Sequence, residues 1–91
     1  NKILEAVAEM EGVHVDDLLG QKRSAKIAIP RQLAMYILRQ YIEISLPQVG
    51  EILGGRDHTT VMYATKKVNE NEKLRNRARK IWDAVNEDLV N

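Results

Sequence analysis

The fold of this chain is decided by Gly54-Gly55-Arg56-Asp57-His58-Thr59-Thr60-Val61, together with the preceding stretch Ser45-Leu46-Pro47-Gln48-Val49-Gly50. The paired glycines predict a tight turn, because glycine adopts backbone conformations that other residues avoid. Asp57 and the two threonines predict the polar first turn of a helix. A short helix, a glycine turn and a second helix with a polar tip together indicate a helix-turn-helix, here at about residues 46–69.

The two predicted helices of this unit have recognisable starts and faces. Ser45 with Gln48 forms a capping box, Pro47 suits a first helical turn, and Asp57 is a candidate cap for the second helix. One face of the second helix is suited to packing: Val61, Ala64, Thr65 and Val68. The opposite face is a poor core face, with His58 at its edge: Thr59, Met62, Tyr63 and Lys66.

The remaining sequence predicts an all-α domain, because no stretch alternates with the period of two typical of strands. An amphipathic helix ends at Gly12, and a short helical turn over 16–19 ends at Gly20. Residues 21–29 read as a basic loop or a frayed turn, and Pro30 as the first turn of a central helix. Its apolar residues are Leu33, Ala34, Met35, Tyr36, Ile37, Leu38, Tyr41, Ile42 and Ile44. Asn71 caps a last helix with the packing stripe Leu74, Ala78, Ile81, Trp82, Val85 and Leu89.

Length and composition bound the class of protein. The 91 residues suffice for one small domain, and no apolar run approaches the ~20 residues of a membrane span. Without cysteine there is no disulfide and no thiolate zinc site. The chain begins at Asn1 rather than at a methionine, so we interpret it as a fragment of a longer protein, one domain over residues 1–91.

The net charge of +1 is unevenly distributed. Residues 1–20 hold one positive and five negative side chains, residues 21–67 eight positive and three negative, and residues 68–91 five of each. The basic excess therefore coincides with the helix-turn-helix, and a localised positive field favours a polyanion partner. Ordinary charge scatter is the alternative interpretation.

Several side chains at the tip of the second helix suit the edges of base pairs. Asp57 can accept from a cytosine amino group, and His58 can donate or accept. Thr59 and Thr60 offer hydroxyls and methyls, and Lys66 and Lys67 lie further along, within reach of phosphates. The alternative is that Asp57 only caps the helix and the threonines are solvated. Arg23 of the basic loop could enter an A·T-rich minor groove, but its residue type alone favours a solvated surface arginine.

No arrangement in the sequence indicates catalysis or metal binding. His14 has no second ligand at metal spacing, and no nucleophile stands beside a base. Asp57 and His58 are adjacent, and side chains of adjacent helical residues point ~100° apart, which argues against a working acid–base pair. We therefore expect no enzyme activity, cofactor or metal.

These segments resemble a known family. Residues 54–61 resemble the signature of the C-terminal DNA-binding domain in the DnaA family of bacterial replication initiators. Three further segments are similar to that domain: Pro30-Arg31-Gln32-Leu33-Ala34-Met35-Tyr36, Ser45-Leu46-Pro47-Gln48-Val49-Gly50, and Asp17-Leu18-Leu19 followed by Lys22-Arg23-Ser24. The resemblance covers essentially the whole chain.

The resemblance implies a Trp-repressor-like bundle that binds double-stranded DNA as a monomer, at asymmetric DnaA boxes resembling TTATNCACA in the replication origin. It implies that Arg23 reads the minor groove, and that the base-reading set is completed by Pro47, Asp57, His58, Thr59 and Thr60. Phosphate contacts are assigned to Lys22, Arg31, Gln32, Arg39, Leu46, Tyr63, Lys66 and Lys67. It further implies a cytoplasmic, nucleoid-associated protein whose ATP-binding domain is absent here. The acidic first helix is a candidate contact surface for that domain.

The sequence departs from the family pattern at three positions. Ile29 and Ala25 replace basic residues, and Tyr63 stands where histidine is common, which puts secondary backbone contacts in doubt. Two alternatives are a transcription regulator with another target and a protein-interaction module using the acidic helix and the Trp82 helix. The charge distribution favours DNA over that module.

Overall fold

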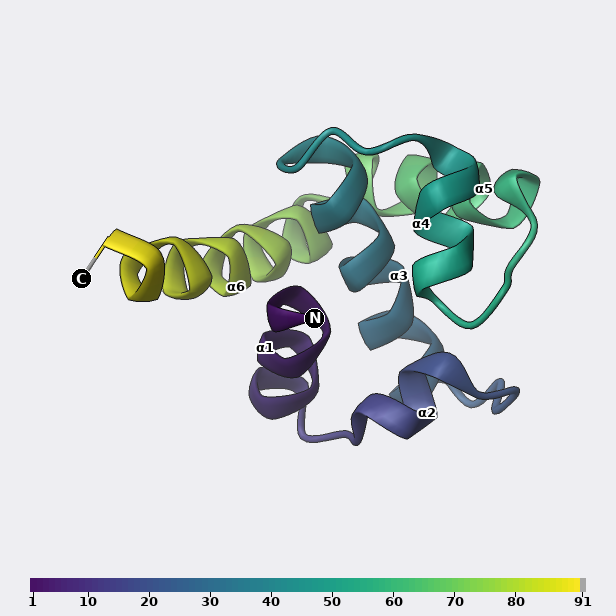
Figure 1. The fold of residues 1–91 in the computed structure, drawn as a ribbon, viewed down its shortest axis with the longest axis horizontal. Helices are drawn as coiled ribbons and strands as arrows, with labels where there is room; N and C mark the ends of the chain where they lie inside the picture. The colour runs from purple at the N-terminus through teal and green to yellow at the C-terminus, as the bar shows by residue number, and fades with distance from the viewer. Residues whose placement is uncertain (91) are drawn as a thin grey trace.

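The computed structural model describes residues 1–90, with side chains to residue 87, and these residues form helices without a strand (Figure 1). In chain order the helices are α1 (Lys2–Glu11), α2 (Val15–Leu19), α3 (Ala25–Gln40), α4 (Leu46–Ile52), α5 (His58–Asn69) and α6 (Glu72–Val90). The predicted all-α class is confirmed. The short helix α2 is the helical turn predicted before Gly20.

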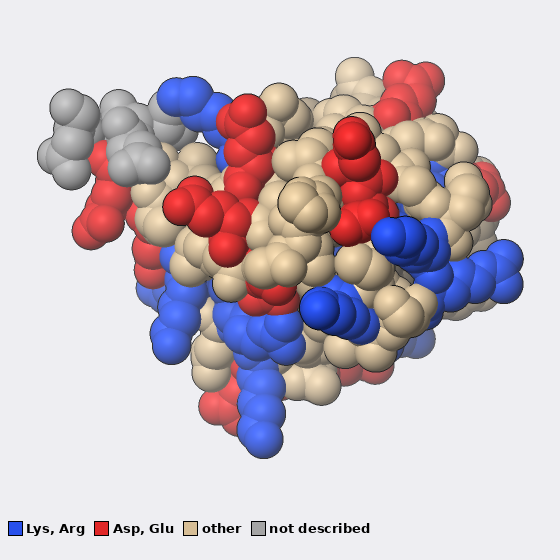
Figure 2. Space-filling view, turned by 90° about the horizontal axis from the view of Figure 1, so that it is seen from below, with Lys and Arg blue, Asp and Glu red and all other residues tan. Residues whose placement is uncertain are grey.

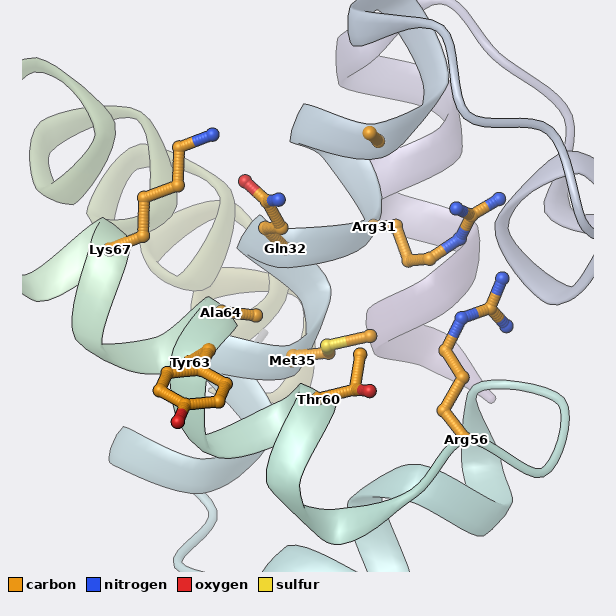
Figure 3. Close-up of a pocket in the computed structure, with 9 residues that line it drawn as sticks. Arg31, Gln32, Met35, Arg56, Thr60, Tyr63, Ala64 and Lys67 are labelled. Carbon is orange, nitrogen blue, oxygen red and sulfur yellow. The ribbon is translucent and has the colours of Figure 1, made fainter.

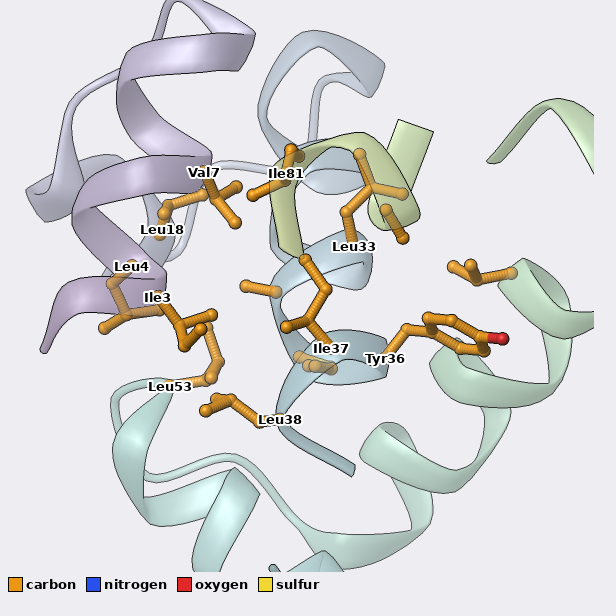
Figure 4. Packing of buried hydrophobic residues seen from close by; sticks show 14 of the residues in the cluster. Ile3, Leu4, Val7, Leu18, Leu33, Tyr36, Ile37, Leu38, Leu53 and Ile81 are labelled. Atoms are coloured by element: carbon orange, nitrogen blue, oxygen red, sulfur yellow. The ribbon is translucent and has the colours of Figure 1, made fainter. Parts of the chain in front are cut away.

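The central helix α3 packs against each of the other five helices. Its sequence explains this position, because a helix that is apolar around most of its circumference has to be covered on all sides. Six consecutive side chains of α3 are buried: Leu33, Ala34, Met35, Tyr36, Ile37 and Leu38. The pair α1 and α6 lies on one side of α3, and the pair α4 and α5 on the other (Figure 1). Figure 4 shows side chains from α1, α3 and α6 meeting in the resulting core.

The start of α3 differs from the prediction. The helix begins at Ala25, so residues 25–29 are not a loop, and Pro30 lies inside the helix rather than in its first turn. The carbonyl of Ser24 accepts the first bonds, from the N–H groups of Ile27 at 2.9 Å and Ala28 at 2.8 Å. Burial of Ile27 and Pro30 stabilises this N-terminal extension of α3. Pro30 has no N–H to donate to the carbonyl of Lys26. Because Lys26 is exposed, water can donate to that carbonyl instead.

The predicted helix ends are confirmed at three positions. Gly12 ends α1 in the left-handed conformation, with φ of 70°. Ser45 and Gln48 form the reciprocal capping box of α4, with Pro47 in the first turn. The side chain of Asn71 accepts from the N–H of Leu74 at 3.1 Å and so caps α6. These local signals were readable because each depends on residues close in sequence.

The helices α4 and α5 are joined by residues 53–57 and form the helix-turn-helix. Gly54 and Gly55 have φ of 86° and 85°, and the backbone N–H of Arg56 returns to the carbonyl of Gly50 at 2.8 Å. A Cβ at Gly50 would overlap the carbonyl oxygen of Arg56. Gly50 therefore permits the close approach that folds the turn back onto α4.

The last helix completes the core and holds an aromatic stack. Its predicted stripe is confirmed for the buried residues Leu74, Ala78, Ile81 and Val85, while the side chain of Leu89 lies outside the described residues. Trp82 is half-buried and stacks on Tyr41 with ring centroids 5.2 Å apart and planes 8° apart. This stack fixes α6 against the end of α3.

We expect Gly50→Ala to lower the free energy of unfolding by about 1–3 kcal/mol, because backbone must move to admit the methyl group. Gly12→Ala is the control. Its added Cβ meets no atom within 4 Å, so its cost is the left-handed strain of about 1 kcal/mol. Urea denaturation of the three proteins measures both losses. A loss for Gly50→Ala no larger than that for Gly12→Ala would contradict the close packing of the turn.

Candidate nucleic-acid interface

The first two turns of α5 present a face of polar side chains to solvent. His58 and Thr60 are exposed, and Thr59 is half-buried. The opposite face packs inward through Val61, Ala64 and Val68, as predicted. Because the buried face fixes the helix, the outward side chains are carried on a rigid element. A rigid helix with a polar outer face is what insertion into a DNA groove requires.

Asp57 occupies the N-cap position of α5, but its side chain accepts no capping hydrogen bond. The carboxylate instead contacts the Nδ1 atom of His58 at 3.1 Å. The argument that adjacent side chains diverge by ~100° is therefore wrong here. It applies between two helical residues, whereas Asp57 has extended backbone, with φ of −62° and ψ of 143°. Both side chains are more than half exposed, so water surrounds the pair and leaves its polar atoms free for a partner.

A hollow of about 330 Å³ lies between α3 and α5, next to the exposed face of α5 (Figure 3). Five residues predicted to contact DNA line it together: Arg31, Gln32, Thr60, Tyr63 and Lys67. They share it with Arg56 and three apolar side chains, so the lining holds three cations and no carboxylate. Such an arrangement concentrates positive potential beside the helix that carries the polar face.

Two further polar side chains belong to this hollow. Tyr63 is 64% exposed, and its hydroxyl can donate to an anion. The Oε1 atom of Gln32 is buried and has no hydrogen-bond partner. Because this oxygen accepts hydrogen bonds, an anion does not complete it, and the amide NH2 of Gln32 is the group that can donate to a phosphate.

Arg31 is a buried residue of α3, only 7% exposed, in contrast to the other predicted phosphate contacts. Its guanidinium donates to the carbonyls of Asp17 at 2.7 Å, Leu18 at 2.9 Å and Lys22 at 2.9 Å. Burial, and then the charge of nearby Arg56, lower the pKa of Arg31 from its ordinary value. Three of its five N–H donors are thus committed to the protein, which gives Arg31 a structural role that the sequence did not reveal.

Arg56 is the residue of the Gly-Gly-Arg-Asp stretch to which sequence reasoning gave no role. It is half-buried, and burial lowers the pKa of its guanidinium. The side chain donates to the carbonyls of Leu53 and Gly20 and lies 3.5 Å from that of Leu19. Figure 3 shows Arg56 and Arg31 extending toward each other from the turn and from α3. An arginine between a glycine turn and a helix cap was the signal available, but its partners Gly20 and Leu19 lie 36 and 37 residues away in sequence.

The loop between α2 and α3 holds Arg23 exposed to solvent. Its neighbour Lys22 pairs with Asp17 at 3.1 Å. The hydrogen bond from Lys22 keeps the pKa of the Asp17 carboxyl below its ordinary value. The carbonyls of Lys22 and Gly20, close to Arg23 in the chain, accept hydrogen bonds from Arg31 and Arg56, which links the loop to α3 and to the turn before α5.

The remaining predicted contacts are spread over the same region of the chain. Pro47 is exposed and Leu46 half-buried in the first turn of α4. Arg39 and Lys66 line a second hollow, also between α3 and α5, and Arg39 donates to the carbonyl of Ile44 at 3.1 Å. The structure therefore brings most of the predicted phosphate set to α5 and the adjoining side of α3.

Charges of the two signs occupy different parts of the surface. On the face drawn in Figure 2, acidic side chains gather over the middle and upper part, and lysine and arginine side chains border them at the right and below. The acidic residues of α1 include Glu5 and Glu9, both exposed. The segregation expected from the sequence thus survives folding.

The described residues contain no group of three or more potential metal-ligating side chains. No helix formed by them is long and apolar enough to cross a membrane.

Comparison with known proteins identifies this architecture. The family model described as the bacterial DnaA protein helix-turn-helix matches residues 1–68. The chain belongs to that family. The match ends at Val68, one residue before the end of α5, so it covers all the predicted DNA contacts.

Three proteins named chromosomal replication initiator protein DnaA illustrate the similarity. The chain is 43% identical over 88 residues to that of Picosynechococcus sp., covering 92% of this chain and 20% of the relative. It is 48% identical over 85 residues to that of Leifsonia xyli subsp. xyli, covering 93% and 17%. It is 45% identical over 87 residues to that of Chloroflexus aurantiacus, covering 96% and 18%. The chain thus spans about a fifth of the length of these DnaA relatives.

We expect Arg31→Gln to lower the free energy of unfolding by about 1–3 kcal/mol, because buried carbonyls at the end of α2 lose their donor. Arg39→Gln is the matched control, since it removes the same charge from the same helix at an exposed position. Its effect should stay within about 0.5 kcal/mol. Chemical denaturation without DNA provides the measurement. Equal stability of the two variants would contradict the structural role of Arg31.

Proposed function

We propose that this domain binds double-stranded DNA in a sequence-specific manner at DnaA boxes of the replication origin, as part of the initiation of chromosomal replication. The observation that carries the proposal is the exposed polar tip of α5 beside a hollow lined by three cations and no carboxylate. A duplex needs both features, because phosphates supply affinity and base edges supply sequence preference. Membership of the DnaA helix-turn-helix family supports the same conclusion.

In this proposal α5 is the recognition helix and lies in the major groove. Asp57 and His58 hydrogen-bond to base edges, and Thr59 and Thr60 offer methyls to thymine as well as hydroxyls. Pro47, exposed at the start of α4, packs against a thymine methyl. The close contact between Asp57 and His58 supports a joint role, because each side chain orients the other.

Arg23 reads the minor groove in the same complex. Its exposure in a loop leaves the whole side chain available, and a narrow A·T-rich groove concentrates negative potential. The TTAT half of a TTATNCACA-type box provides such a groove. Lys22, already paired with Asp17, contributes charge beside it.

Phosphate contacts hold the domain in register on the duplex. Tyr63, Lys67 and Gln32 line the hollow next to α5 together with Arg31, which retains two N–H donors. Arg39 and Lys66 flank the second hollow, and the first turn of α4 offers free N–H groups at Leu46. Tyr63 serves where related proteins carry histidine, since its exposed hydroxyl can donate to a phosphate.

The rest of the proposal concerns the parent protein. We infer that residues 1–91 form one domain, that it acts as a monomer on each asymmetric box, and that it catalyses no reaction itself. ATP binding belongs to another part of the parent protein. The chain spans about a fifth of the length of its relatives, and that part lies outside it. We further propose a cytoplasmic, nucleoid-associated protein in which the acidic face of α1 contacts the ATP-binding domain.

The direct test is a fluorescence-anisotropy titration of a duplex with one TTATNCACA-type box against a scrambled duplex of equal length. We expect box binding at least about 1,000-fold tighter than scrambled binding, the lower end for specific DNA-binding proteins. Affinity for both should fall steeply with salt as counterions are released. Equal binding to the two duplexes would disprove box specificity. Absence of binding to either would favour a protein-interaction module.

Arg23→Ala should weaken binding to the box far more than binding to the scrambled duplex, by about 1–3 kcal/mol in discrimination. The physical reason is that a side chain inserted in a groove senses its shape, whereas a phosphate contact acts on any sequence. Lys26→Ala is the matched control, because Lys26 is an exposed cation near the same loop with no assigned contact. Equal losses of Arg23→Ala on both duplexes would reduce Arg23 to phosphate neutralisation.

A further inference from the structure

Two arginines from different elements donate to backbone carbonyls between residues 17 and 22. The guanidinium of Arg31 in α3 donates to the carbonyls of Asp17, Leu18 and Lys22. The guanidinium of Arg56 in the helix-turn-helix donates to the carbonyl of Gly20 and lies beside the carbonyl of Leu19. Together they occupy the C-terminal end of α2 and the start of the basic loop, where a helix leaves carbonyls without partners of its own.

A second observation places the turn of the helix-turn-helix directly on α2. A Cβ at Gly54 would overlap the carbonyl oxygen of Leu19, so the two backbones touch at this point. Gly54 also has φ of 86°, which a side chain would strain. The contact between the turn and α2 is thus made by a backbone without a side chain and reinforced by Arg56 from the same turn.

The same contacts restrain the segment that carries Arg23. The carbonyls of Gly20 and Lys22 are held by Arg56 and Arg31, and Ser24 begins α3 as its N-cap. The backbone around Arg23 is therefore fixed on both sides while its side chain is free. Arg56 is also joined to the recognition helix, since Asp57 follows it as the N-cap of α5.

We propose that Arg56 is a positioning residue that fixes the basic loop against the recognition helix, so that Arg23 and the tip of α5 engage one duplex together. This inference rests on the proposed DNA-binding function. An ordered loop loses little further conformational freedom on binding, which leaves more of the contact energy for affinity. A guanidinium suits the task because its rigid fork can hold several carbonyls in fixed directions.

The role predicts that the effect of Arg56 depends on Arg23. Arg56→Gln, Arg23→Ala and the double variant of the 91-residue chain are titrated against the box duplex. We expect Arg56→Gln to weaken box binding about tenfold when Arg23 is present and about twofold or less when it is absent, as for coupled residues. With Thr59→Ala in place of Arg23→Ala, the loss caused by Arg56→Gln should stay about tenfold.

Arg77→Gln is the matched control, because Arg77 also joins two elements, by pairing with Glu11, and loses the same charge. It should leave box affinity unchanged. Circular dichroism at the assay temperature checks that every variant is folded. If Arg56→Gln is unfolded, Arg56→Lys replaces it, since lysine keeps the charge but lacks the fork. An equal loss from the Arg56 substitution with and without Arg23 would overturn the inference.

A measurement without DNA separates this inference from the proposed function. Trypsin cleavage after Lys22 and Arg23 reports how often the basic loop opens. We expect faster cleavage at these sites in Arg56→Gln than in the original chain or Arg77→Gln. Unchanged cleavage would overturn the inference even if the box is bound. Faster cleavage together with no box preference in the original chain would instead remove the proposed function and, with it, any role of Arg56 in DNA reading.

Discussion

Burial of the apolar surface around α3 is the constraint on which the rest of the domain depends. Every other helix packs against α3, so the position of each is set by how its apolar face fits there. The proposed recognition helix α5 is no exception, since Val61, Ala64 and Val68 anchor it on its inner side while its polar face remains outside. A precise outer surface on α5 is thus a consequence of a well-packed inner one.

Around this core, the region that we propose to face DNA is organised by backbone carbonyls and arginines. The short helix α2 ends with carbonyls that its own five residues cannot satisfy, and Arg31 and Arg56 supply the donors. Both guanidinium groups are partly buried, and burial lowers the pKa of each. Neither is paired mainly with a carboxylate. The protein thereby keeps two positive charges, with Lys67, in a hollow beside the proposed recognition helix. Local structure and attraction for a polyanion come from the same groups.

The helix-turn-helix owes its shape to places where a side chain would not fit. Gly50 allows the turn to return to α4, and Gly54 allows it to touch α2. Because the second contact lies outside the helix-turn-helix, the motif is held within a larger frame that includes the basic loop. In the proposed complex this frame sets the distance between the element in the major groove and the arginine in the minor groove.

Apart from the start of α3, the helices, three of the helix ends and the outward face of α5 could be predicted from local sequence. Gly12, Ser45 with Gln48, and Asn71 act over a few residues, and the spacing of Val61, Ala64 and Val68 needs only helical geometry. The likeness to the DnaA family came from contiguous motifs for the same reason. The start of α3 at Ala25 was missed, since burial of Ile27 and Pro30 outweighs the local signal of proline. The roles of Arg31 and Arg56 depend on the tertiary structure, because all the carbonyls they bind except that of Leu53 lie 9 to 37 residues away, and no local pattern records which chain segments meet.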